Sequence, residues 1–119
     1  MWCGLIARGK PIFALPGNPV STLVCTTRYL LPALRTAAGL NPAPPELVEL
    51  AAPVDASPDL TLFMPVTLSW SRTGTALATP RPTNTSGDFT ALAGTDGFVE
   101  LSAQAHPHPA GTVARLFRW

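Results

Sequence analysis

The clearest alternation of apolar and polar positions runs from Leu60 to Trp70. Every second residue of this stretch is apolar, and Thr61 and Thr67 are among the residues between them. Alternation with a period of two predicts a strand with one face toward a core and the other toward water. Pro65 lies inside the stretch and cannot donate a ladder hydrogen bond, so we expect this part of the strand at an edge or a bulge.

Shorter apolar runs predict further strands in the C-terminal two thirds of the chain. They cover residues 47–50, 75–79, 98–101 and 113–117. The run Ser71-Arg72-Thr73-Gly74 predicts the turn that follows the main strand. Several short strands joined by turns are typical of a small β-barrel or β-sandwich.

The N-terminal third has a different pattern, with two short apolar runs followed by helical spacing. Residues 5–7 and 12–15 predict a strand pair joined by Arg8-Gly9-Lys10-Pro11, and the uninterrupted second run predicts a strand buried on both faces. Apolar residues three and four apart then predict a helix from Pro19 to about Gly39, with Arg28 and Arg35 on its polar side. Pro32 lies within this helix and predicts a kink, because it removes one backbone hydrogen bond.

These elements predict an α/β tail followed by a small all-β barrel domain. A strand pair and one helix bury too little apolar surface to fold alone, so we expect residues 1–40 to end a larger three-layer α/β domain. Residues 41–46 form a proline-rich linker and residues 47–119 the barrel domain. The alternative is that the first third packs on the residues that follow and shares their core.

The composition indicates which classes of partner the chain can have. Charged residues make up 13% and apolar residues 46%, so we expect part of the surface to be covered by other protein. The net charge of +1, without a run of basic residues, argues against nucleic acid. No signal-peptide pattern and no apolar run of about 20 residues occur, which predicts a cytoplasmic protein without a membrane span.

The cysteines and histidines carry no strong signal for a metal site. We expect Cys3 and Cys25 to be reduced, buried thiols. His106 and His108 alternate with prolines, but no carboxylate or thiol is spaced to complete a metal site, which favours a solvated loop.

The loop between the second strand and the helix is the first candidate binding site. Gly17 gives conformational freedom, Asn18 is suited to cap the helix, and Pro19 suits its first position. The helix N-terminus, together with the hydroxyl of Ser21, could then receive an oxyanion such as phosphate. The alternative is a well-made strand-to-helix turn without a ligand.

A second candidate lies at residues 84–93, where small polar residues precede a short helical turn. Ser86 or Asp88 can cap that turn, and its N-terminus could also receive an anion. A capped turn that closes one end of a barrel is the alternative. Neither candidate identifies a catalytic group.

Several motifs together resemble one known family. They are Gly9-Lys10-Pro11, Leu15-Pro16-Gly17-Asn18-Pro19-Val20-Ser21, Pro32-Ala33-Leu34-Arg35, Asn84-Thr85-Ser86-Gly87-Asp88-Phe89 and Asp96-Gly97-Phe98-Val99-Glu100-Leu101. In this order they resemble the C-terminal region of the molybdopterin molybdenumtransferase family, to which the C-terminal domain of gephyrin is related. The resemblance implies the C-terminal part of a homodimeric cytoplasmic enzyme that uses Mg²⁺ to insert molybdate into adenylylated molybdopterin, with release of AMP.

The resemblance also implies roles for particular residues. Gly17, Asn18, Pro19 and Ser21 would lie at the substrate pocket, and Ser86 on the barrel segment that faces it. The acidic and lysine residues that handle Mg²⁺ and the phosphates would lie upstream of this chain.

One position departs from the family pattern. Where many members read Phe-x-Arg, this chain reads Phe63-Met64-Pro65, which leaves Arg72 or Arg81 as substitutes for the missing arginine. Besides part of an enzyme, a non-catalytic β-barrel interaction module remains open as the function.

Overall fold

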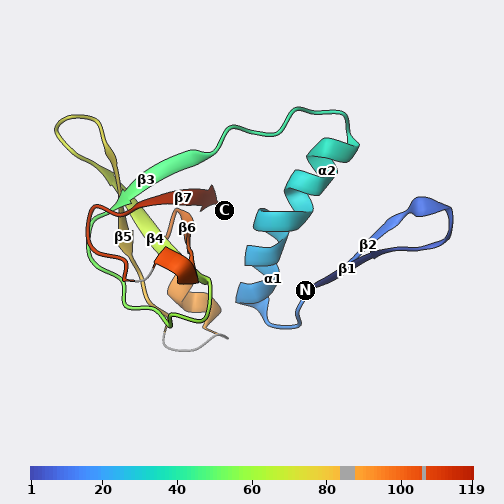
Figure 1. Ribbon diagram of the computed structural model, residues 1–119, viewed down its shortest axis with the longest axis horizontal. Coiled ribbons are helices and arrows are strands. Elements are labelled where there is room, and N and C mark those ends of the chain that lie inside the picture. The colour runs from blue at the N-terminus through green and yellow to red at the C-terminus, as the bar shows by residue number, and fades with distance from the viewer. Residues whose placement is uncertain (84–87, 106) are drawn as a thin grey trace.

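A strand hairpin, a long irregular helix and a closed β-barrel follow one another along the chain (Figure 1). The structure is a computed structural model that describes residues 1–83, 88–105 and 107–119. The hairpin and helix precede an extended connection, which leads into the barrel near residue 46. The architecture is therefore the predicted strand pair and helix followed by an all-β unit.

The barrel closes through five strands in the order β3-β5-β4-β6-β7. The strands are β3 (Glu46–Leu50), β4 (Leu62–Trp70), β5 (Ala76–Pro80), β6 (Gly97–Leu101) and β7 (Val113–Arg118). Neighbours pair antiparallel except β3 and β5, which run parallel over two residue pairs. Each predicted strand of the C-terminal part is present, and its ends lie within two residues of those expected.

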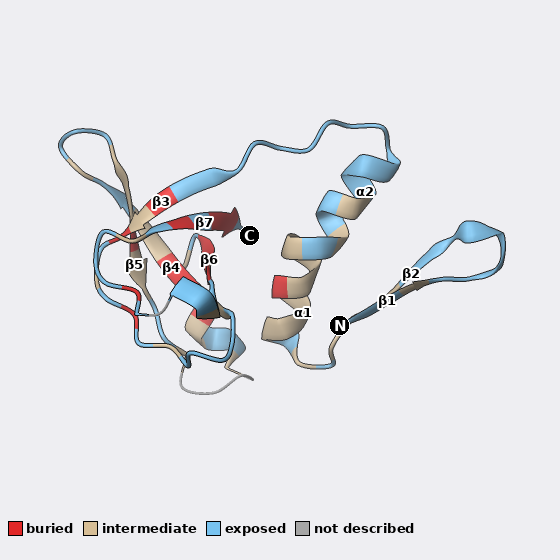
Figure 2. Ribbon diagram, viewed as in Figure 1, coloured by how far each residue is buried: buried red, intermediate tan, exposed pale blue. Residues whose placement is uncertain are grey.

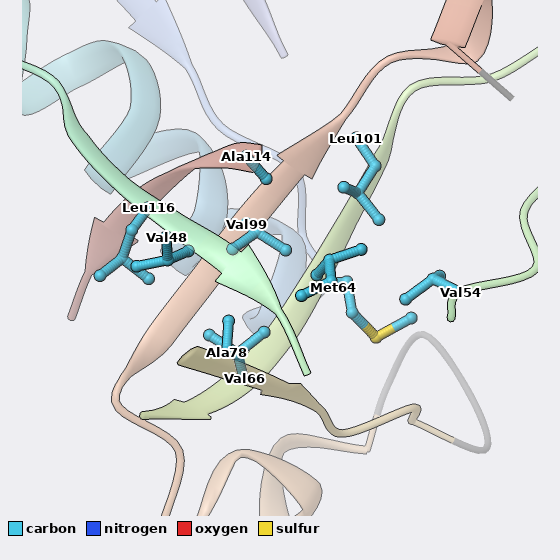
Figure 3. Close-up of a cluster of buried hydrophobic side chains, with 10 residues drawn as sticks. Val48, Val54, Met64, Val66, Ala78, Val99, Leu101, Ala114 and Leu116 are labelled. Atoms are coloured by element: carbon cyan, nitrogen blue, oxygen red, sulfur yellow. The ribbon is translucent and has the colours of Figure 1, made fainter. Parts of the chain in front are cut away.

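The core fills the interior of the barrel (Figure 3). Its buried side chains are Val48, Leu50, Val54, Met64, Val66, Ala78, Val99, Leu101, Ala114 and Leu116. Met64 and Val66 confirm the inward face predicted for β4, whereas Leu60 and Trp70 at the two ends of that pattern are 68% and 63% exposed. The alternation therefore identifies the correct face, but only its middle lies within the closed barrel.

Around Pro65 the strand β4 has a paired strand on one side only, which confirms the edge position expected there. Residues of β4 pair with β6 over 62–66 and with β5 over 66–70. The carbonyl oxygen of Pro65 accepts the Arg81 N–H at 2.8 Å, just beyond the end of β5. Since the N–H and C=O of one strand residue point to the same side, the donor missing at Pro65 faces the place where β5 ends.

The long helix consists of α1 (Pro19–Cys25), a π-helical segment η2 (Thr26–Leu30) and α2 (Leu31–Ala37). Its bounds agree with the prediction, and Gly39 follows it with a φ of +74°. The irregular segment ends two residues before Pro32, and the Leu31 N–H donates to Thr26 O. A wide turn thus accommodates the hydrogen bond that the proline removes.

The helix packs on the outside of the barrel through a second apolar cluster. Val24 is buried there with Phe98 and Phe117, and Phe63 packs against them. The Phe98 and Phe117 rings stack with centroids 5.1 Å apart, and Phe63 meets Phe98 edge-on at 5.7 Å. The alternative in which the first third packs on the following residues is right for the helix, although this cluster is separate from the barrel core.

The hairpin is formed by β1 (Trp2–Leu5) and β2 (Pro11–Ala14), joined through η1 (Ala7–Gly9). It extends away from the barrel and is mostly exposed (Figure 2). The expectation that the second strand is buried on both faces is wrong for the described chain, because three of the four residues of β2 are exposed. The first strand also ends earlier than expected, since residues 6–9 make the turn.

The exposure of the two cysteines differs from the prediction. Cys3 is exposed and Cys25 half-buried, so the prediction of buried thiols is wrong, although both are free cysteines. Among the described residues, none of the helices has the length and apolar character needed to cross a bilayer.

Candidate functional site

The loop before α1 forms the predicted helix cap. Asn18 has extended backbone angles, φ −72° and ψ 124°, and its Oδ1 accepts the Ser21 N–H at 3.1 Å. The carbonyl oxygen of Asn18 accepts the Thr22 N–H at 2.8 Å. Thr22 Oγ1 lies within hydrogen-bond distance of the carbonyl oxygens of both Asn18 and Pro16. Asn18 as cap and Pro19 as first helical residue are thus confirmed.

The cap occupies most of the backbone N–H groups that could otherwise donate to an anion. Pro19 has no N–H, and the N–H groups of Ser21 and Thr22 are both bound to Asn18. Within the described part of the chain, the first turn retains the Val20 N–H and the half-buried hydroxyl of Ser21. The helix N-terminus can therefore offer an oxyanion two donors and the positive end of its dipole.

Gly17 occupies a position at which the fold does not require glycine. It is exposed, its φ lies outside the left-handed region, and a Cβ built on it would meet nothing within 4 Å. The expectation that Gly17 supplies an unusual backbone conformation is therefore wrong. What the missing side chain does provide is open space beside the cap.

The second candidate is only partly within the described residues. Ser86 lies outside them, as does His106. Asp88 caps the 3₁₀ turn η3 (Phe89–Leu92), and its Oδ1 accepts the Ala91 N–H at 3.2 Å and the Thr90 hydroxyl at 2.6 Å. A carboxylate already lies at this N-terminus, which disfavours a second anion there.

The two arginines considered as substitutes lie at different distances from Pro65 along the barrel. Arg72 belongs to the turn after β4, where the Gly74 N–H donates to Ser71 O at 3.0 Å. Arg81 is paired with Pro65 through its backbone N–H. Because paired residues point to the same face of a sheet, Arg81 is the arginine that adjoins the altered position.

Two ion pairs join segments that are distant in sequence. Arg28 holds Glu100 through Nε–Oε2 at 3.0 Å and Nη2–Oε1 at 3.3 Å. Arg118 holds Glu46 in the same forked manner, at 2.9 and 2.6 Å. The hydrogen bond from Arg118 is the main cause that lowers the pKa of Glu46, and the same contact raises the pKa of Arg118.

Helical spacing predicts Arg28 on the polar side of the helix, and this prediction is wrong. Its side chain is 26% exposed and faces the barrel, where the guanidinium lies 5.1 Å from the Phe117 ring centroid. The partner Glu100 is 72 residues away in sequence, so no local pattern could have indicated the pair.

His108 also differs from its prediction. The residue is 2% exposed, and its carbonyl oxygen accepts the Val54 N–H at 2.9 Å, so it is not part of a solvated loop. No three His, Cys, Asp or Glu side chains gather to hold a metal ion in residues 1–83, 88–105 and 107–119.

Comparisons with known proteins relate the chain to molybdopterin biosynthesis. Residues 48–116 match the family described as the MoeA C-terminal region (domain IV). Over 120 aligned positions the chain is 38% identical to a molybdopterin molybdenumtransferase from Synechocystis sp., and the match covers 100% of this chain but 28% of that protein.

Solved structures of MoeA proteins are also similar to this chain. A molybdopterin biosynthesis MoeA protein from Pyrococcus horikoshii superposes with a TM-score of 0.72 at 31% identity, covering 98% of this chain and 28% of that one. A second such structure, from strain OT3, gives a TM-score of 0.67 at 16% identity over 87% of this chain and 26% of that one, which shows the fold alone. The chain thus spans little more than a quarter of these relatives.

Proposed function

This chain belongs to the MoeA family, and from that membership we propose that it serves as part of a molybdopterin molybdenumtransferase. The reaction proposed for the whole enzyme inserts molybdate into adenylylated molybdopterin and releases AMP. We further propose that the enzyme works as a homodimer in the cytoplasm. The named Synechocystis relative supports the reaction class.

The loop before α1 is the proposed contribution of this chain to substrate binding. The observation that carries the proposal is the combination of an ordered cap at Asn18 with an open position at Gly17. Substrate phosphate or molybdate oxygens would approach the backbone at Gly17, where a side chain would stand in their way. The Val20 N–H and the Ser21 hydroxyl would then donate to an oxygen of the substrate.

Arg81 is the proposed source of positive charge on the barrel side. It adjoins Pro65, which stands where many family members have arginine, and its backbone is fixed by the hydrogen bond to Pro65 O. An exposed guanidinium at this position could bind an oxyanion in a forked manner. Ser86 belongs to the same proposal by its place in the family motif.

We propose that the ligands of Mg²⁺ lie outside residues 1–119. Among the described residues, no three carboxylate, histidine or cysteine side chains gather. Bound Mg²⁺ would neutralise charge on the substrate phosphates, but this chain is proposed to contribute only hydrogen-bond donors and positive charge. We accordingly expect residues 1–119 alone to release no AMP.

Binding measurements on the chain test the proposal directly. Adenylylated molybdopterin is titrated into the wild type, Gly17→Ala and Ser21→Ala, with exposed Ser69→Ala as the control. We expect at least tenfold weaker binding for Gly17→Ala without a change in the midpoint of thermal unfolding, because its Cβ would meet no protein atom. Ser21→Ala should weaken binding as well, and Ser69→Ala should not.

The result also separates the two functional interpretations. Unchanged affinity in both loop variants would contradict the substrate role and support the plain turn, and with it the interaction module. Measured AMP release from wild-type residues 1–119 would contradict the proposal that this chain contributes only hydrogen-bond donors and positive charge.

A further inference from the structure

A cleft lies at the other end of the helix, between α2, the connection to β3 and the strand β7. It has a volume of about 250 Å³ and continues into a second hollow of about 100 Å³. The two hollows share Pro32, Arg35, Ala43 and Arg115 in their walls. The connection that leads from α2 to β3 (Figure 1) contributes Ala43, Pro44 and Pro45 to the wall of the cleft.

Arginines dominate the charge around this cleft. Arg35, Arg115 and Arg118 line it, and Glu46 is the one acidic residue among the lining side chains. Arg118 already holds Glu46. In the described part of the chain, Arg35 and Arg115 form no ion pair, so the cleft carries two positive charges without a carboxylate.

Arg115 is exposed and stacks on an aromatic ring. Its guanidinium carbon lies 4.7 Å from the centroid of the Phe117 ring. Stacking on an aromatic face leaves the edge of the guanidinium, with its N–H groups, available to an acceptor. Glu100, its pairing partner on β6, already accepts both hydrogen bonds from Arg28 and does not compete for this edge.

The C-terminus of α2 repels a negatively charged ligand only weakly. A helix C-terminus carries partial negative charge because its last carbonyl groups lack partners. Here Leu34, Arg35 and Thr36 each have a carbonyl oxygen that accepts a backbone N–H from residues 38–40. With these carbonyls bound, the arginines determine the local charge.

We propose that this cleft binds a small organic anion, a carboxylate or phosphate group carried on a compact apolar body. Arg35 and Arg115 would hold the anionic group, and Leu31, Pro44 and Phe117 would cover its apolar part. The main hollow of about 250 Å³ with the adjoining 100 Å³ lies at the lower end of the roughly 300–1,000 Å³ usual for drug-sized ligands, so a small molecule fits better than a nucleotide. At 1.5 Å per residue, Arg35 lies about 24 Å along the helix from Pro19, so the cleft is separate from the proposed substrate loop.

Titrations followed by NMR test the site in the full chain. The probes are benzoate, inorganic phosphate and the uncharged benzyl alcohol, and the variants are Arg35→Gln, Arg115→Gln and, as control, Arg72→Gln in a turn outside the cleft. We expect saturable benzoate binding that perturbs the cleft residues and that weakens at least tenfold in either cleft variant but not in Arg72→Gln. Inorganic phosphate should bind more weakly than benzoate, and benzyl alcohol should not bind.

Several outcomes would overturn the proposal. No saturable benzoate binding, or equal losses in Arg72→Gln and the cleft variants, would refute a built anion site. Phosphate binding as tight as benzoate would refute the apolar part of the ligand. Arg35 is exposed, so its variant keeps the fold and decides the result even if Arg115→Gln unfolds.

Discussion

The Arg28–Glu100 ion pair should contribute measurably to the docking of the helix on the barrel. To isolate this contribution, Arg28→Met removes the charge but keeps an apolar chain over the Phe117 ring, and Glu100→Gln removes the opposite charge. The two single variants and the double variant form a double-mutant cycle. The free energy of unfolding of each is measured by chemical denaturation.

The expected magnitude follows from the geometry and the partial burial of the pair. Both hydrogen bonds of the fork are present, at 3.0 and 3.3 Å, and the side chains are 26% and 25% exposed. Fully exposed pairs contribute about 0–1 kcal/mol, whereas breaking a buried pair costs about 3–5 kcal/mol. We expect Arg28→Met to lower the free energy of unfolding by about 2 kcal/mol, and the coupling energy to be about 1 kcal/mol.

A matched control is available in the same chain. Arg118 and Glu46 form a fork at 2.9 and 2.6 Å, but their side chains are 47% and 44% exposed. Solvent and salt screen such a pair more strongly, so its coupling energy should be about 0.5 kcal/mol or less. A coupling for Arg28 and Glu100 no larger than that of the control pair would refute the argument from burial.

Three further predictions concern single positions. Gly97→Ala should cost about 2–3 kcal/mol of stability in denaturant unfolding, since its Cβ would overlap the Phe117 carbonyl oxygen across the ladder; a near-neutral result would contradict this close approach. Asn18→Ala should cost about 1 kcal/mol in thermal unfolding through loss of the helix cap, and an unchanged midpoint would show that the cap does not matter. The hydrogen bond from Arg118 lowers the pKa of Glu46, so the ion pair stabilises the fold above the ordinary pKa of 4.5, and this stabilisation is lost as the pH falls below 4.5. Glu46→Gln should therefore flatten the acid side of a curve of stability against pH, and identical curves for the variant and the wild type would refute the coupling.

The strands of the barrel could be predicted because each carries its own local signal. The alternation along β4 gave the inward positions of Met64 and Val66 correctly. The turn after it was readable from Ser71 and Gly74, which close it by a hydrogen bond of 3.0 Å. Closure into a barrel depends on the pairing of β3 with β7, which are far apart in sequence, and the pattern of short strands alone also allowed a sandwich.

In the candidate site, too, the local contacts could be predicted from the sequence and the long-range contacts could not. The cap at Asn18 is local, since acceptor and donor are three residues apart, and the sequence predicted it. The pairing of Arg81 with Pro65 and of Arg28 with Glu100 spans many residues, so it became visible only in the folded chain. Gly17 is the opposite case, because the sequence suggested a backbone requirement that the structure does not contain.

Few contacts fix the helix relative to the barrel, and this bears on any site that uses both. Val24 is the one buried side chain of the helix within the described residues, and it rests on Phe98 and Phe117. One turn later Arg28 adds the ion pair with Glu100. A single buried valine contributes about 1.5–3 kcal/mol, comparable to the cost expected for Arg28→Met. The docking of the helix therefore rests on two adjacent turns, and the loop at Asn18 is placed relative to Arg81 through these contacts rather than through the barrel core.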